Sequence, residues 1–101
     1  MKAKSFAEMI NEDRRITMLR AIESADGALN EALLTKIVND FGIRTSRDQI
    51  RTELNWLKEQ GLIDIDDIAD LYIAKLNHRG LDVAQGHVRV PGIARPLRND
   101  G

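Results

Sequence analysis

Apolar residues recur at helical spacing through the middle of the chain. In the stretch between Asn30 and Gly42 they are Leu33, Leu34, Ile37, Val38 and Phe41. This i, i+3, i+4 spacing places them on one face of an amphipathic helix. Asn30 can accept a hydrogen bond from a first-turn amide, and Gly42 can end the helix in a left-handed conformation. The pattern therefore predicts a helix between these two residues.

A longer helix is predicted ahead of this one, from Phe6 to Ala25. Ser5 and Glu8 have the spacing of a capping box, and Gly27 follows as a stop. The apolar residues of this helix are Phe6, Met9, Ile10, Ile16, Met18, Leu19 and Ile22. They spread beyond one stripe, and such a helix is usually covered on more than one side. Later segments of the chain and a second copy of the chain are the two candidate covers.

A third helix is predicted after a short glycine-containing turn at residues 42–45. It runs from Ser46 to Gly61, with a second capping box at Ser46 and Gln49. Its apolar stripe consists of Ile50, Leu54 and Leu57. This stripe must face the core, whereas Trp56 lies off it and is expected to be half buried.

Two strands and a last helix are predicted after the third helix. Residues 62–65 and 71–76 are rich in aliphatic side chains and flank an acidic turn at residues 66–70. These features predict an antiparallel hairpin. Asn77 can then cap a short helix that extends to Gln85.

The segment from His87 onward is predicted to be separate from a folded domain at residues 1–86. Pro91, Gly92 and Pro96 break any helical period, so we expect residues 87–101 to be extended or disordered, or laid along a partner. The charged residues of this tail are Arg89, Arg95, Arg98 and Asp100. The tail is therefore basic, and the rest of the chain is net acidic.

Composition narrows the possible functions. The chain has 101 residues, which fits one domain, and its formal net charge of −1 gives no overall field that attracts nucleic acid. It has no cysteine, which excludes disulfides and thiolate metal sites and fits a reducing compartment. No secretory leader and no membrane span are recognisable in the sequence, so we expect a cytoplasmic protein that does not bind membranes.

Helix, turn, helix and hairpin in this order resemble a winged helix-turn-helix, an α+β fold that is mainly α with a small β-hairpin. Residues 47–63 are similar to the recognition helix and first wing strand of bacterial winged-helix regulators. Residues 12–15 (EDRR), 46–52 (SRDQIRT) and 91–96 (PGIARP) resemble a family of small proteins of Mu-like bacteriophages and prophages, often described as ArsR-like regulators. The resemblance implies a DNA-binding protein that acts as a dimer in transcription or another phage DNA transaction, in the cytoplasm of the bacterial host.

Metal sensing and catalysis are not expected. ArsR proteins that sense thiophilic metals through the recognition helix use cysteines there, and this chain has none. Asp64 and Asp66 begin like a calcium loop, but Ala69 stands where that loop requires glycine. His78 and His87 lie outside any nucleophile or metal-ligand spacing. We therefore expect no cofactor, no metal and no enzymatic activity.

The exposed face of the third helix carries candidate DNA-contacting residues. Arg51 and Asn55 are of the types that bind guanine and adenine edges bidentately. Arg47 lies in the first turn, where recognition helices enter the major groove, and Thr52 is suited to a phosphate or a thymine methyl. The full predicted DNA-binding set is Arg44, Arg47, Arg51, Thr52, Asn55, Lys58, Arg89, Arg95 and Arg98. The tail arginines would supply attraction that is independent of sequence.

The acidic hairpin favours a different partner. Its aspartates are Asp64, Asp66, Asp67 and Asp70. Carboxylates at a wing would repel phosphates, and i, i+4 pairs such as Asp48 and Thr52 also fit a merely solvated helix surface. The alternative hypothesis is an interaction module that binds a phage or host protein and no DNA. The broad apolar arc of the first helix fits this alternative, and it equally fits a homodimer through that helix.

Overall fold

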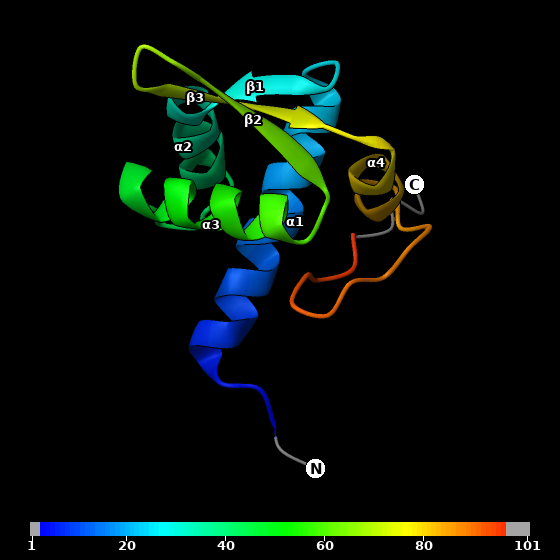
Figure 1. Cartoon of the computed structure of the whole chain (residues 1–101). Helices are drawn as coiled ribbons and strands as arrows, with labels where there is room; N and C mark the ends of the chain where they lie inside the picture. The colour runs from blue at the N-terminus through cyan, green and yellow to red at the C-terminus, as the bar shows by residue number, and fades with distance from the viewer. Residues whose placement is uncertain (1–2, 97–101) are drawn as a thin grey trace.

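The computed structural model describes residues 3–96. Within these residues four helices and one three-stranded antiparallel sheet form a single domain, which confirms the predicted α+β class (Figure 1). In chain order the elements are α1 (Phe6–Ser24), β1 (Ala28–Asn30), α2 (Glu31–Asp40), α3 (Arg47–Glu59), β2 (Ile63–Ile68), β3 (Leu71–Leu76) and α4 (His78–Ala84). None of the helices in the described part of the chain is long and apolar enough to cross a membrane.

Every described helix begins at the side-chain cap that the sequence predicts. The capping residues are Ser5, Asn30, Ser46 and Asn77. Each accepts a hydrogen bond from the amide three residues further on, so one first-turn amide of every helix is satisfied. The glycines after the helices, Gly27, Gly42, Gly61 and Gly86, all have positive φ. Helix boundaries therefore follow from local chemistry.

The sheet differs from the predicted hairpin in two ways. Strand β1 was not predicted; it pairs antiparallel with β3 and gives the strand order β1-β3-β2. Strand β2 extends to Ile68, which pairs with Leu71, so the loop contains only Ala69 and Asp70. Both loop residues have positive φ, as a two-residue hairpin loop of this kind requires. The aspartates that indicated a turn lie mostly along the strand instead.

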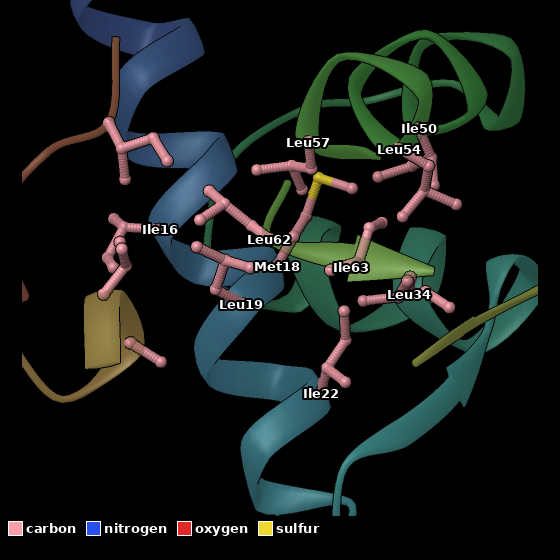
Figure 2. Packing of buried hydrophobic residues seen from close by; sticks show 14 of the residues in the cluster. Ile16, Met18, Leu19, Ile22, Leu34, Ile50, Leu54, Leu57, Leu62 and Ile63 are labelled. Atoms are coloured by element: carbon pink, nitrogen blue, oxygen red, sulfur yellow. The ribbon is translucent and has the colours of Figure 1, made fainter. Parts of the chain in front are cut away.

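The hydrophobic core lies between the helices and one face of the sheet (Figure 2). Its fully buried large side chains include Met18, Leu19, Ile22, Leu34, Ile50, Leu54, Leu57 and Leu62. The predicted stripe of α3 is thus confirmed, and Trp56 is half buried as expected. Later segments cover α1 from Ile16 onward, but Phe6 and Met9 in its first turns remain 78% and 52% exposed.

Residues 87–96 have no helix or strand, yet they pack on the domain rather than standing free of it. Val90 and Ile93 are buried in the core. The amide of Ala94 donates to the carbonyl of Glu12 at 3.2 Å, which fixes the segment along α1. The expectation of an extended or disordered tail missed this packing, because two isolated apolar residues give no periodic signal. Arg98 lies outside the described residues.

Candidate functional site

A fully buried carboxylate lies beneath the N-terminal half of α3. Glu31, the first residue of α2, is 0% exposed. Arg51 donates to it from two nitrogens, Nε to Oε1 at 2.7 Å and Nη2 to Oε2 at 2.8 Å. Nε of Arg47 also donates to Oε1, at 3.0 Å, and the amide of Tyr72 donates to Oε2 at 2.5 Å. One side chain therefore joins α2, α3 and β3.

These hydrogen bonds hold the carboxyl group in its charged form. The hydrogen bonds from Arg51 lower the pKa of Glu31 most; burial opposes them, and the Tyr72 amide and Arg47 lower it further, to about 2. The same contact raises the pKa of Arg51 above its ordinary value. Glu31 and Arg51 are therefore both charged at neutral pH, and the buried carboxylate has compensating partners.

Arg51 uses its remaining contacts on the hairpin. It donates to the carbonyl oxygen of Asp70 in the loop, and its guanidinium lies over the ring of Tyr72 with Cζ 4.1 Å from the ring centre. The arginine that was predicted to bind guanine is thus directed at Glu31 and at the hairpin. A base contact from Arg51 would have to replace these interactions.

The other predicted residues of this region form one exposed surface over the turn and α3. They are Arg44, Arg47, Thr52, Asn55 and Lys58. Thr52 Oγ1 donates to the carbonyl of Asp48 at 3.1 Å, and Asn55 Nδ2 donates to the carbonyl of Arg51 at 3.1 Å. The carbonyl of Arg44 accepts a 3.4 Å hydrogen bond from Arg14, and the side chain of Arg44 is exposed. We call these five residues the α3 surface.

Two of the predicted tail arginines, Arg89 and Arg95, do not join the α3 surface. Arg89 and Arg95 line a cleft between α1, α4 and the tail, together with Arg20 of α1. No residue of α3 lines this cleft. The described residues of the predicted DNA-binding set are thus divided between two places. The sequence did not predict this division, because it gives no signal that the tail packs on α1.

A second buried carboxylate, Glu53 on α3, was missed together with Glu31. Nε of Arg15 donates to Glu53 Oε1 at 2.8 Å, and Nη1 of Arg14 lies 4.0 Å from Oε2. Burial lowers the pKa of Arg14. Both glutamates had a signal in the sequence, because each continues an apolar stripe: Glu53 lies between Ile50 and Leu57 at helical spacing.

Arg15 connects Glu53 to the tail. Its guanidinium lies over Trp56, with Cζ 3.9 Å from the ring centre, and its Nη1 donates to the carbonyl of Gly92 at 2.8 Å. A Cβ atom placed on Gly92 would come within 2.8 Å of the Trp56 ring. Glycine is therefore required where the tail crosses α3.

The hairpin keeps its acidic surface. Asp66 pairs with Lys75 at 2.6 Å, and this hydrogen bond raises the pKa of Lys75. Asp64, Asp67 and Asp70 are exposed, and no cation of residues 3–96 lies within 4.0 Å of their carboxylates. In the same part of the chain, no group of three histidine, cysteine or acidic side chains could hold a metal ion.

Comparison with known proteins places the chain in a phage family. Uncharacterized protein gp26 of Escherichia phage Mu is 36% identical over 89 residues, which cover 88% of this chain and 93% of gp26. The chain belongs to the gp26 family. An uncharacterized protein of Haemophilus influenzae is 38% identical to this gp26-family chain over 78 residues, 76% of each protein. The resemblance to proteins of Mu-like phages is thus confirmed.

Two further comparisons give no indication of the function of this chain. No family model matches the chain. Replication factor C small subunit of Methanocaldococcus jannaschii is 31% identical to the gp26-family chain over 81 residues, but these cover only 4% of that protein. A match to so small a part of a protein carries no argument about its activity.

Proposed function

We propose that this gp26-family chain is a winged helix-turn-helix protein that binds double-stranded DNA through the α3 surface. The order of elements supports the fold: a helix, a short strand, two helices joined by a turn, a hairpin and a last helix. The hairpin β2–β3 lies beside α3, where a wing would stand (Figure 1). The proposal places the protein in the bacterial cytoplasm as a regulator of transcription or of another phage DNA transaction.

The composition of the α3 surface carries the proposal. Its five residues are exposed along the turn and α3, and the helical part from Arg47 to Lys58 spans roughly 17 Å at about 1.5 Å per residue. Arg44 and Lys58 near its two ends have no carboxylate of residues 3–96 within 4.0 Å, so they are available to phosphates. Thr52 and Asn55 lie between them and have side chains suited to base edges.

The Glu31 cluster has a supporting role in this proposal. It holds α3 against α2 and the hairpin, so the α3 surface is presented on a rigid base. Arg51 is then a positioning residue rather than a base reader. With few base-reading side chains left, most of the affinity would come from phosphates and would fall steeply with salt.

The test is a fluorescence anisotropy titration of a labelled mixed-sequence duplex at low salt. We expect the double variant Arg44→Ala, Lys58→Ala to bind at least tenfold more weakly than the wild type, since two phosphate contacts are lost. The control is Arg79→Ala, which removes one positive charge at an exposed position of α4 outside the α3 surface. Equal loss in both variants, or no binding by the wild type, would refute the proposal.

A homodimer through α1 belongs to the same proposal. Phe6 and Met9 expose apolar surface on the first turns of α1, which extend beyond the rest of the domain (Figure 1). Sedimentation of the wild type and of Phe6→Ser would show a dimer that the substitution weakens. A monomer in both samples at high micromolar concentration would remove this part of the proposal.

A second candidate is a winged-helix module that binds a phage or host protein and no DNA. The exposed aspartates of the hairpin favour it, because they would repel a phosphate backbone near the α3 surface. Affinity capture from infected cells, treated with nuclease, separates the two candidates. Recovery of one specific protein that survives nuclease supports the module, and recovery of nucleic acid alone excludes it.

A further inference from the structure

The cleft between α1, α4 and the tail has the size and lining of a binding site. Its volume is about 760 Å³, within the range of ligand pockets. Its apolar lining is mainly aliphatic and includes Val83, Val88, Val90 and Ile93. Three arginines, Arg20, Arg89 and Arg95, complete it. We call it the arginine cleft.

The arginines of this cleft are among those that form no ion pair within the described residues. Within residues 3–96, the arginines with a carboxylate partner inside 4.0 Å are Arg14, Arg15, Arg47 and Arg51. Those of the arginine cleft have none, although the whole chain carries a net charge of −1. The only acid lining the cleft in the described structure is Glu23, which accepts a hydrogen bond from Gln85 at 2.9 Å. The cleft is therefore positive and suited to an acidic occupant with an aliphatic side chain.

The hairpin loop of the chain itself has these properties. Ile68 is 55% exposed at the end of β2, next to Asp67 and close to Asp70. The hydrogen bond from Arg51 to the carbonyl of Asp70 ties the loop to α3. The loop stands at one end of the domain and the tail with α4 at the other, so it cannot enter its own cleft (Figure 1).

We propose that the hairpin loop of one copy binds in the arginine cleft of a second copy. Ile68 would lie against the valines of the cleft, with Asp67 and Asp70 close to its arginines. Because loop and cleft are different surfaces, the contact is head-to-tail and leads to a ring or an open chain of copies. A contact of one loop is smaller than a standard interface, so we expect a low affinity and association only at high protein concentration. Because the contact pairs exposed charges, salt should weaken it. This inference does not depend on DNA binding.

Sedimentation velocity without DNA tests the proposal with two variants of reversed charge, Asp67→Arg in the loop and Arg89→Glu in the cleft. The wild type should sediment faster as its concentration rises from about 10 μM to 1 mM, a range suited to a weak contact, and each variant alone should stay at the size of the free species. An equal mixture of the two should associate again. The arginine introduced into one loop can then pair with the glutamate introduced into the other cleft, and the unchanged loop can bind the unchanged cleft.

The matched control is Arg79→Glu, which makes the same charge change on α4 outside the cleft and should associate like the wild type. Association by either Asp67→Arg or Arg89→Glu alone, or a mixture that does not recover, would overturn the proposal. A wild type that does not associate over this range would also overturn it. A dimer through α1 is distinguishable, because Phe6→Ser weakens it and mixing does not restore it.

Discussion

Glu31 and Glu53 are two buried carboxylates that hold opposite sides of α3. Each pairs with two arginines, and in each pair one arginine also lies over an aromatic ring. The stacked pairs are Arg51 over Tyr72 and Arg15 over Trp56. The first cluster connects α3 to α2 and the hairpin, and the second connects it to α1 and the tail. The same combination of carboxylate, arginines and aromatic ring thus attaches α3 to different elements on its two sides.

The two clusters differ in how completely the carboxylate is satisfied. Glu31 accepts four hydrogen bonds, two of them from Arg51. Glu53 accepts one short hydrogen bond, from Arg15, while Arg14 directs its closer contacts to Thr45 and Asn11. The Glu31 cluster should therefore stabilise the contact of α3 with the hairpin more than the Glu53 cluster stabilises its contact with the tail.

Removal of the Glu31 carboxylate should have the largest effect. Glu31→Ala leaves Arg47 and Arg51 without their counter-ion and the Tyr72 amide without its acceptor. Hydrogen bonds to a charged group contribute roughly 1.5–3 kcal/mol each. Glu31 accepts four of them, and its arginines are partly exposed to solvent, so we expect a net loss of about 3–5 kcal/mol in the free energy of unfolding, measured by urea denaturation. Glu59→Ala, at an exposed position of α3, should change it by less than about 0.5 kcal/mol. Similar losses in both variants would contradict the role of Glu31.

Acid should release the same stabilisation without a mutation. The folded pKa of Glu31 is about 2, below its ordinary value of 4.5, so its contribution is complete above pH 4.5 and is lost as the pH falls toward 2. The shift corresponds to about 3 kcal/mol. Urea denaturation at a series of pH values should show this decline in the wild type. Glu31→Gln should lack that part of the decline, and parallel curves for the two proteins would refute the assignment.

Removal of the Glu53 carboxylate should have a smaller and differently placed effect. A hydrogen bond to a charged group contributes roughly 1.5–3 kcal/mol, and Glu53→Ala should lower the free energy of unfolding by about 2 kcal/mol. Because Trp56 is the single tryptophan and Tyr72 the single tyrosine, their fluorescence reports on the two clusters separately. The substitution should shift Trp56 emission in the folded protein. Unchanged Trp56 fluorescence together with changed Tyr72 fluorescence would contradict the assignment of Glu53 to the tail side of α3.

Gly92 tests whether the tail crossing belongs to the second cluster. Gly92→Ala combines a left-handed backbone at φ 94° with a contact of 2.8 Å to Trp56, and should cost about 2 kcal/mol. Gly42→Ala is the matched control, because Gly42 has φ 88° and open space around it, so only the backbone cost of about 1 kcal/mol applies. Thermal unfolding measures both. Equal losses of stability in the two variants would show that the tail can move away from Trp56 without a measurable cost.

Local chemistry made most of the fold predictable, and long-range contacts account for the rest. Caps such as Asn30 and stops such as Gly42 act within one helical turn, so the sequence indicates helix boundaries directly. Strand β1 is too short to show alternation, and its partner β3 is distant along the chain.

The candidate site was predictable only in part. The exposed positions of Thr52 and Asn55 followed from the stripe of α3. The contact between Arg51 and Glu31 did not follow from that stripe, because Glu31 lies on another helix. Glu31 continues the apolar stripe of α2, and this signal was overlooked.

The most direct test of the proposed function is a map of backbone amide shifts during titration of the folded protein with a duplex. The proposal predicts the largest shifts over residues 44–58, with Thr52 and Asn55 among them, and little change at Arg89 and Arg95 in the arginine cleft. Shifts confined to the hairpin loop or the cleft, or no shifts at low salt, would contradict DNA binding by the α3 surface.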